Sequence, residues 1–208
     1  MATWATFYPY LASHVPGCPD PVMDRALSQS AAEFFRRTRA WIEWLPGVTT
    51  AAGVREYALP LAGYTTGAEV VRIEQATINA LPLPILSFRD ASTNWANYEQ
   101  PNEGILSFDR ENFTTATAYG AGQLIDIQAS LMPSDLATGI PDRLFPPYVD
   151  DIVAGARARL MLIPGTDFAS PQLAIDARNA FERAIDNKTV DAFRGHTGIA
   201  KRVRASWC

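Results

Sequence analysis

The residue types that carry most enzyme chemistry are scarce in this chain and are not spaced for it. The two histidines, His14 and His196, have no cysteine or carboxylate nearby at the spacing of metal ligands. The sequence contains no G-x-S-x-G nucleophile elbow, no P-loop and no G-x-G-x-x-G motif. We therefore predict that the protein is not an enzyme and has no catalytic, metal-binding or cofactor-binding residue. A Ser-His-Asp set assembled from distant segments stays open as an alternative.

Adjacent acidic residues are the next place to look for chemistry. Asp150 and Asp151 could serve as acid–base partners or as Mg²⁺ ligands. On a helix, however, neighbouring side chains point about 100° apart, so the two carboxylates would not converge on one ion. We prefer the interpretation that they stabilise the first turn of a helix. Asp90, Asp109 and Glu111 have no spacing that suggests a site.

Aromatic side chains suggest binding rather than catalysis. At the ends of predicted elements or in loops, such residues are often buried in protein–protein contacts, although packing in the protein's own core is the alternative. Seven aromatic residues lie at such positions: Trp41, Trp44, Trp95, Tyr98, Phe113, Tyr119 and Phe145.

The C-terminal end of the chain differs in charge from the remainder. It contains Arg194, Lys201, Arg202 and Arg204 and no acidic residue, whereas the remainder has 14 basic and 22 acidic residues, a balance of −8. Such a basic end predicts contact with something negative, or else a solvated terminus. Trp207 has little of its own domain left to pack on, so it is a candidate anchor for a partner's pocket.

Composition sets the broad class. The chain has 208 residues, of which 48% are hydrophobic and 19% charged, as is typical of a soluble globular protein. No apolar run approaches the roughly 18 residues of a membrane span, and the N-terminus lacks the pattern of a signal peptide. Two cysteines, Cys18 and Cys208, make no disulfide framework, which favours a reducing compartment.

Three segments have the apolar spacing and end signals of helices. Residues 146–163 place Val149, Ile152, Val153, Ala156, Leu160 and Ile163 on one face. Pro146 and Pro147 suit the first turn of this helix, and Gly155 and Ala156 leave room for a second helix. Residues 20–40 begin with an Asp-Pro pair that predicts an N-cap, and residues 170–193 begin with Ser-Pro.

Short strands are predicted between these helices. Residues 48–50 and 57–59 are predicted to form a hairpin, and residues 70–78 and 124–129 alternate as half-buried strands do. In residues 70–78, Val71 and Ile73 are expected on one face. A short helix is predicted over 87–98 and a strand over 105–108. Without full-length helical crossovers, these strands predict an antiparallel sheet or small sandwich.

Together these elements predict an α+β fold. The predicted architecture is a bundle of long α-helices, one N-terminal and two C-terminal, with an inserted antiparallel β-region. The helical bundle would comprise residues 1–40 and 141–194, the inserted β-region residues 41–140, and a C-terminal arm residues 195–208.

The order of several segments resembles the head-to-tail adaptor proteins of tailed bacteriophages, over roughly Asp20 to Ile185. The segments are ALSQSAAEFFRRTRAW, REYALPL, VVRIEQATIN, IPDRL, DDIVAGARARLMLIPG and FASPQLAIDARNAFERAI. Glu56 to Pro60, Gly155-Ala156 and Arg159-Leu160 are the most specific of these matches. The resemblance implies the same helical bundle with an inserted β-region, and no catalytic residue or cofactor.

The resemblance also implies a function and partners. It implies a structural virion protein that forms a homo-oligomeric ring, of twelve copies in that family. The ring would lie in the virion neck, between the portal protein and a downstream tail or nozzle protein. It would line the channel through which genomic DNA passes without sequence-specific contact. Such a protein is made in the host cytoplasm and needs no membrane. The arm with Lys201, Arg202, Arg204 and Trp207 would bind the portal.

Three other readings remain open at the level of sequence. A tail terminator or tail-tube protein would also form rings but would meet different neighbours. A soluble non-viral binding module would be a monomer or dimer with a ligand of its own. An enzyme with an unrecognised site is the third.

Overall fold

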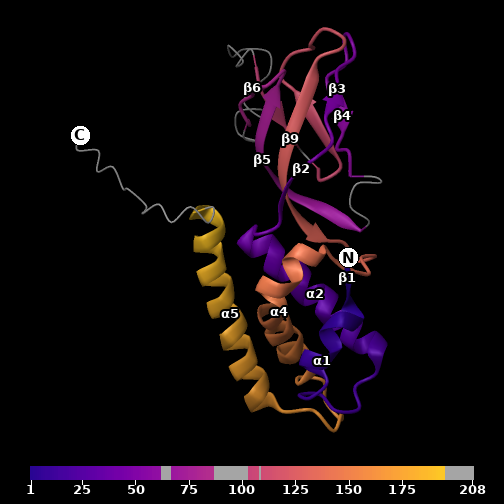
Figure 1. Ribbon diagram of the computed structural model, residues 1–208, viewed down its shortest axis with the longest axis vertical. Coiled ribbons are helices and arrows are strands. Elements are labelled where there is room, and N and C mark those ends of the chain that lie inside the picture. Colours follow the sequence, from indigo (N-terminus) through magenta and orange to yellow (C-terminus); the bar gives the residue numbers. More distant parts are fainter. Residues whose placement is uncertain (62–66, 87–102, 108, 195–208) are drawn as a thin grey trace, which may run out of the picture. The chain divides into compact units, whose positions relative to one another are not determined.

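The computed structural model describes residues 1–61, 67–86, 103–107 and 109–194 (Figure 1). The chain divides into two compact units. The helical unit comprises Met1–Ala40 and Ile140–Cys208, and the strand unit comprises Trp41–Gly139. Among the described residues, no helix is both long enough and apolar enough to cross a membrane.

Three long helices make up most of the helical unit. They are α2 (Asp20–Thr38), α4 (Phe145–Leu160) and α5 (Pro171–Arg194). Shorter helices precede α2 and α4: η1 (Trp4–Phe7), α1 (Tyr8–Leu11) and η2 (Asp142–Leu144). In Figure 1, α5 runs beside α4. Phe34 of α2 lies 5.3 Å from the ring of Tyr148 on α4 and 6.3 Å from that of Phe181 on α5. One aromatic cluster therefore joins all three helices.

The helix ends follow the predicted signals with small shifts. The N-cap of α2 is Pro19 rather than Asp20, so Asp20 and Pro21 occupy the first turn. Pro146 and Pro147 lie in the first turn of α4, as predicted. This helix ends at Leu160, earlier than expected, because the chain already turns before Pro164. The amide of Met161 still bonds the helix, while its carbonyl accepts a hydrogen bond of 3.0 Å from Ser170.

The described part of the strand unit contains two sheets. The larger has the order β2-β9-β5-β6, with β3 also paired to β9, and the smaller has the order β4-β8-β7. The strands of the larger sheet are β2 (Ile42–Trp44), β3 (Val48–Thr49), β5 (Ala68–Ile78), β6 (Leu81–Pro82) and β9 (Leu124–Pro133). Those of the smaller are β4 (Glu56–Ala58), β7 (Ile105–Leu106) and β8 (Asn112–Thr115). Two further strands, β1 (Ala2–Thr3) and β10 (Gly139–Ile140), pair with each other.

The predicted alternation holds in β9 and fails in β5. Ile125, Ile127 and Ala129 share the buried face of β9, as expected. In β5, register shifts interrupt the pairing with β9 between Val70 and Arg72 and between Ile73 and Gln75. Because a bulge adds a residue to one strand, the buried positions of β5 become every third residue: Val70, Ile73 and Ala76.

The predicted hairpin of residues 48–50 with 57–59 is wrong. Val48 pairs with Ile125 of β9, and Tyr57 pairs with Phe113 of β8. The rings of Tyr57 and Phe113 stack with centroids 5.5 Å apart. The hydroxyl of Tyr57 donates to the carbonyl of Val54 at 3.0 Å, which holds the connecting loop. Cross-strand packing of the aromatic side chain therefore decides the partner.

The predicted fold class, a long-helix bundle with an inserted β-region, is also wrong. Within its described residues the structure has four α-helices, about 40% of these residues are helical and 25% are strand, and the antiparallel sheet is curled into a half-barrel. It is a mixed α/β fold rather than a long-helix bundle. The physical reason is the length of β5 and β9, 11 and 10 residues. Together with the smaller sheet, strands this long give the strand unit a core of its own, which includes Ile105, Phe113, Ile125, Ile127 and Leu131.

Two predictions fall wholly or partly on residues that the structure does not describe. The short helix over 87–98 lies outside the described residues, as does the arm over 195–208. The strand predicted over 105–108 extends over Ile105–Leu106 only.

Candidate functional site

The residues considered for catalysis do not assemble into a site in the described parts of the chain. No group of three or more His, Cys, Asp or Glu side chains there is arranged to hold a metal ion. The prediction that Asp150 and Asp151 stabilise the first turn of a helix is wrong, because α4 begins at Phe145 and has no acidic residue in its first turn. Burial raises the pKa of Asp151, partly offset by Lys188. His14 lies near Arg157, and burial together with that charge lowers its pKa. His196 is outside the described residues.

Asp109 has a structural role in the turn between β7 and β8. One of its carboxylate oxygens accepts hydrogen bonds from the backbone amides of Glu111, at 2.9 Å, and Asn112, at 2.6 Å. The other accepts from the side-chain amide of Asn112 at 3.2 Å. These bonds, the Asn112 amide first, lower the pKa of Asp109. The carboxylate is therefore occupied in shaping the loop.

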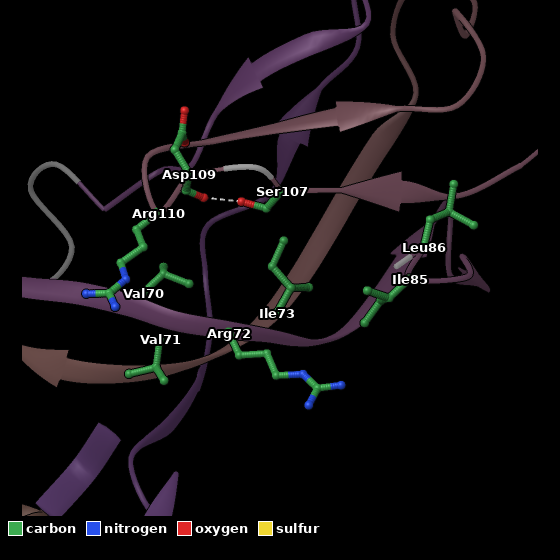
Figure 2. A pocket seen from close by; sticks show the side chains of 9 residues that line it. All are labelled: Val70, Val71, Arg72, Ile73, Ile85, Leu86, Ser107, Asp109 and Arg110. Atoms are coloured by element: carbon green, nitrogen blue, oxygen red, sulfur yellow. Dashed lines mark hydrogen bonds between the residues drawn. The ribbon is translucent and has the colours of Figure 1, made fainter. Parts of the chain in front are cut away.

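The same loop borders a groove along β5 (Figure 2). Its volume is about 380 Å³, and it is lined by Val70, Val71, Arg72, Ile73, Ile85, Leu86, Ser107, Asp109 and Arg110. The Ser107 hydroxyl donates to the backbone carbonyls of Asp109 and Asn112. Both acceptors are backbone carbonyls, so this hydroxyl helps to shape the turn between β7 and β8.

A partly exposed charged cluster joins the three long helices of the helical unit. Glu33 of α2 forms ion pairs with Arg159 of α4 and, at 2.9 Å, with Arg178 of α5. Arg159 also donates to the hydroxyl of Ser30 at 2.8 Å. Glu182 extends the cluster, at 2.5 Å from Arg178. These residues tie the three long helices together through ion pairs.

The environment of Glu33 favours its ionised form. Burial alone would raise the pKa of this carboxyl, but hydrogen bonds from Arg178 and Arg159 outweigh that effect and lower the pKa overall. Sequence reasoning missed this cluster. The spacing of Glu33 with Arg37 was visible as an i,i+4 pair, but the two arginines from other helices were not.

The seven aromatic candidates separate into different environments. Trp41 and Phe113 are core residues, 2% and 0% exposed, whereas Trp44 is 45% exposed. Trp95 and Tyr98 lie outside the described residues, as do the arm residues Lys201, Arg202, Arg204 and Trp207.

No known protein-family model matches the sequence, and no curated protein matches it either.

Proposed function

We propose that the protein is a structural virion protein, a head-to-tail adaptor that forms a ring between the portal and the tail and lines the DNA channel. The observation that carries this proposal is the order of segments described above, from the ALSQSAAEFFRRTRAW segment to the FASPQLAIDARNAFERAI segment. No single segment is diagnostic, but few proteins would contain all of them in this order.

Residues from several of these segments contact one another in the helical unit. Glu33, Arg159 and Arg178 belong to three different resembling segments and meet in one ion cluster. Gly155 of α4 lies against Phe181 of α5, where a Cβ atom would be 2.7 Å from the ring. Thus the residues that create the resemblance also hold the helices together.

A ring needs two different surfaces on each subunit that fit one another. The helical unit exposes large apolar side chains, which are common components of such surfaces. On α5 these are Leu173, Ile175 and Val190, each about half exposed, and Val22 and Leu162 lie elsewhere on the unit. They are candidates for contacts between copies.

The negative net charge of most of the chain is also compatible with a channel that DNA passes through. Outside its C-terminal 15 residues the chain has a net charge of −8, and a negative channel wall would let DNA pass without adhering. The basic arm, with Lys201, Arg202, Arg204 and Trp207, is the proposed portal-binding segment.

Electron microscopy of the protein co-expressed with the portal protein of the same genome tests the proposal. We expect rings seated on the portal, and few or none when the protein is expressed alone. Replacing Lys201, Arg202, Arg204 and Trp207 with alanine should abolish portal attachment. Rings without affinity for the portal would instead indicate a tail terminator or tail-tube protein. A monomer under both conditions would overturn the ring proposal and favour a binding module.

A further inference from the structure

Trp44 is an exposed tryptophan on a sheet face that also contains exposed Leu124. It lies on β2, at the edge of the larger sheet, and its Cα partner on β9 is Gln128. Asp126 is two residues before Gln128 on β9 and is therefore on the same face, and its partner on β5 is Thr77. Ile125 and Ile127 occupy the opposite, buried face. The register thus brings an indole, a carboxylate and a hydroxyl to one surface.

These side chains border a hollow of about 360 Å³, which Trp44, Leu45, Thr77, Ala80 and Asp126 line. Within the described residues, neither the Trp44 ring nor the carboxylate of Asp126 has an ion pair, ring contact or hydrogen-bond partner. An aromatic ring and a charged group that the protein itself leaves unpaired are available to a ligand.

Two backbone positions border the hollow. A Cβ atom at Gly47 would lie 2.6 Å from the Leu124 side chain and 2.8 Å from a carboxylate oxygen of Asp126, so a larger residue there would displace the ends of these side chains. Ala80 and the preceding Asn79 have φ values of 66° and 48°, as the two-residue turn between β5 and β6 requires.

We propose that this hollow binds the side chain of an arginine or lysine presented by a partner protein. A cation over the indole face is attracted by the ring quadrupole, and tryptophan is the best aromatic residue for this contact. The carboxylate of Asp126 supplies a charge-assisted hydrogen bond to the same group. An anion would be repelled by Asp126, and an apolar group would bury that carboxylate unpaired. The site does not depend on the proposed adaptor function, because a monomer would present it too.

Nuclear magnetic resonance of the full ¹⁵N-labelled chain tests the proposal with the peptide acetyl-Gly-Arg-Gly-amide. We expect saturable shifts of the Trp44 indole N–H and of the Thr77 and Asp126 amides. The same peptide with neutral citrulline in place of arginine should bind about tenfold more weakly. Asp126→Asn should weaken binding of the arginine peptide about tenfold, while Asp135→Asn, a change of an exposed acid in the same unit, should leave it unchanged.

Trp44→Phe separates the ring contribution from folding, because phenylalanine keeps the apolar contact but has the weaker cation–π attraction. Its spectrum should stay dispersed, and its affinity for the arginine peptide should fall about threefold. Absence of shifts at these resonances, equal binding of the citrulline peptide, or unchanged affinity of a folded Asp126→Asn variant would each overturn the proposal.

Discussion

At the scale of single residues, Glu33 pairs with one arginine on each of the three long helices. Its carboxylate is 15% exposed and faces Arg37, Arg159 and Arg178. A buried ion pair is not in itself strong support for stability, since desolvation opposes it. Removing one partner is nevertheless costly, because the remaining charges stay partly buried without compensation.

We therefore expect Glu33→Gln to destabilise the protein by about 2 kcal/mol, since two arginines from other helices lose their shared carboxylate. Urea unfolding monitored by circular dichroism measures this change in free energy. Glu56→Gln, at an exposed position in the strand unit, is the matched control and should change stability little. Equal stability of the two variants would show that the cluster contributes nothing.

The same residue predicts a dependence on pH. The pKa of Glu33 in the folded protein is below its ordinary value of 4.5. Its stabilising contribution is therefore fully present above the unfolded value and is lost as the pH falls through the lowered folded value. The three arginines stay charged throughout. The difference in unfolding free energy between wild type and Glu33→Gln should shrink between about pH 6 and about pH 3. A difference that stayed constant over this range would contradict the assignment.

At the scale of elements, the approach of α4 to α5 depends on one glycine. An added Cβ at Gly155 would lie 2.7 to 3.0 Å from three carbon atoms of the Phe181 ring, and Phe181 is fully buried. This confirms the prediction that Gly155 leaves room for a second helix. Glycine inside a helix costs stability, so its presence here indicates that close packing outweighs helix propensity.

We expect Gly155→Ala to destabilise the protein by about 1 to 2 kcal/mol, because overpacking exceeds the gain in helix propensity of about 1 kcal/mol. Thermal and urea unfolding measure the effect. The double variant Gly155→Ala/Phe181→Leu should recover part of the loss, since the smaller side chain gives the methyl group space. A Gly155→Ala variant more stable than wild type would show that the Phe181 ring leaves room for a methyl group, and would contradict this prediction.

At the scale of the whole molecule, each of the two units has a core of its own. Fully buried side chains in the helical unit include Phe7, Phe34, Phe35 and Phe181. Those in the strand unit include Phe113, Ile125 and Ile127. A segment with its own hydrophobic core and few dependencies on the remainder is expected to fold alone.

We expect the fragment Trp41–Gly139, expressed by itself, to fold and to unfold in a single cooperative transition. Its amide spectrum should overlap that of the same residues in the full chain, apart from residues near the two new ends. A spectrum without dispersion, or unfolding without a cooperative transition, would show that this unit requires the helical unit.

The helix starts could be predicted from sequence because they depend on the chemistry of a few neighbouring residues. Pro146, Pro147 and the Ser170-Pro171 pair mark helix starts through the chemistry of the first turn. Strand positions in β5 and β9 were also visible, but their pairing was not. Tyr57 pairs with Phe113, more than fifty residues away, and no local pattern encodes that partner. The bulges of β5 likewise depend on its fit to β9.

The sequence by itself determined the helix positions, the two long strands and the absence of familiar catalytic motifs, because each follows from residues close together in the chain. The tertiary structure alone decided the mixed α/β fold, the ion cluster of Glu33 and the contrast between buried Trp41 and exposed Trp44. These features arise when segments distant in sequence meet, and burial is a property of the assembled neighbours rather than of the residue type.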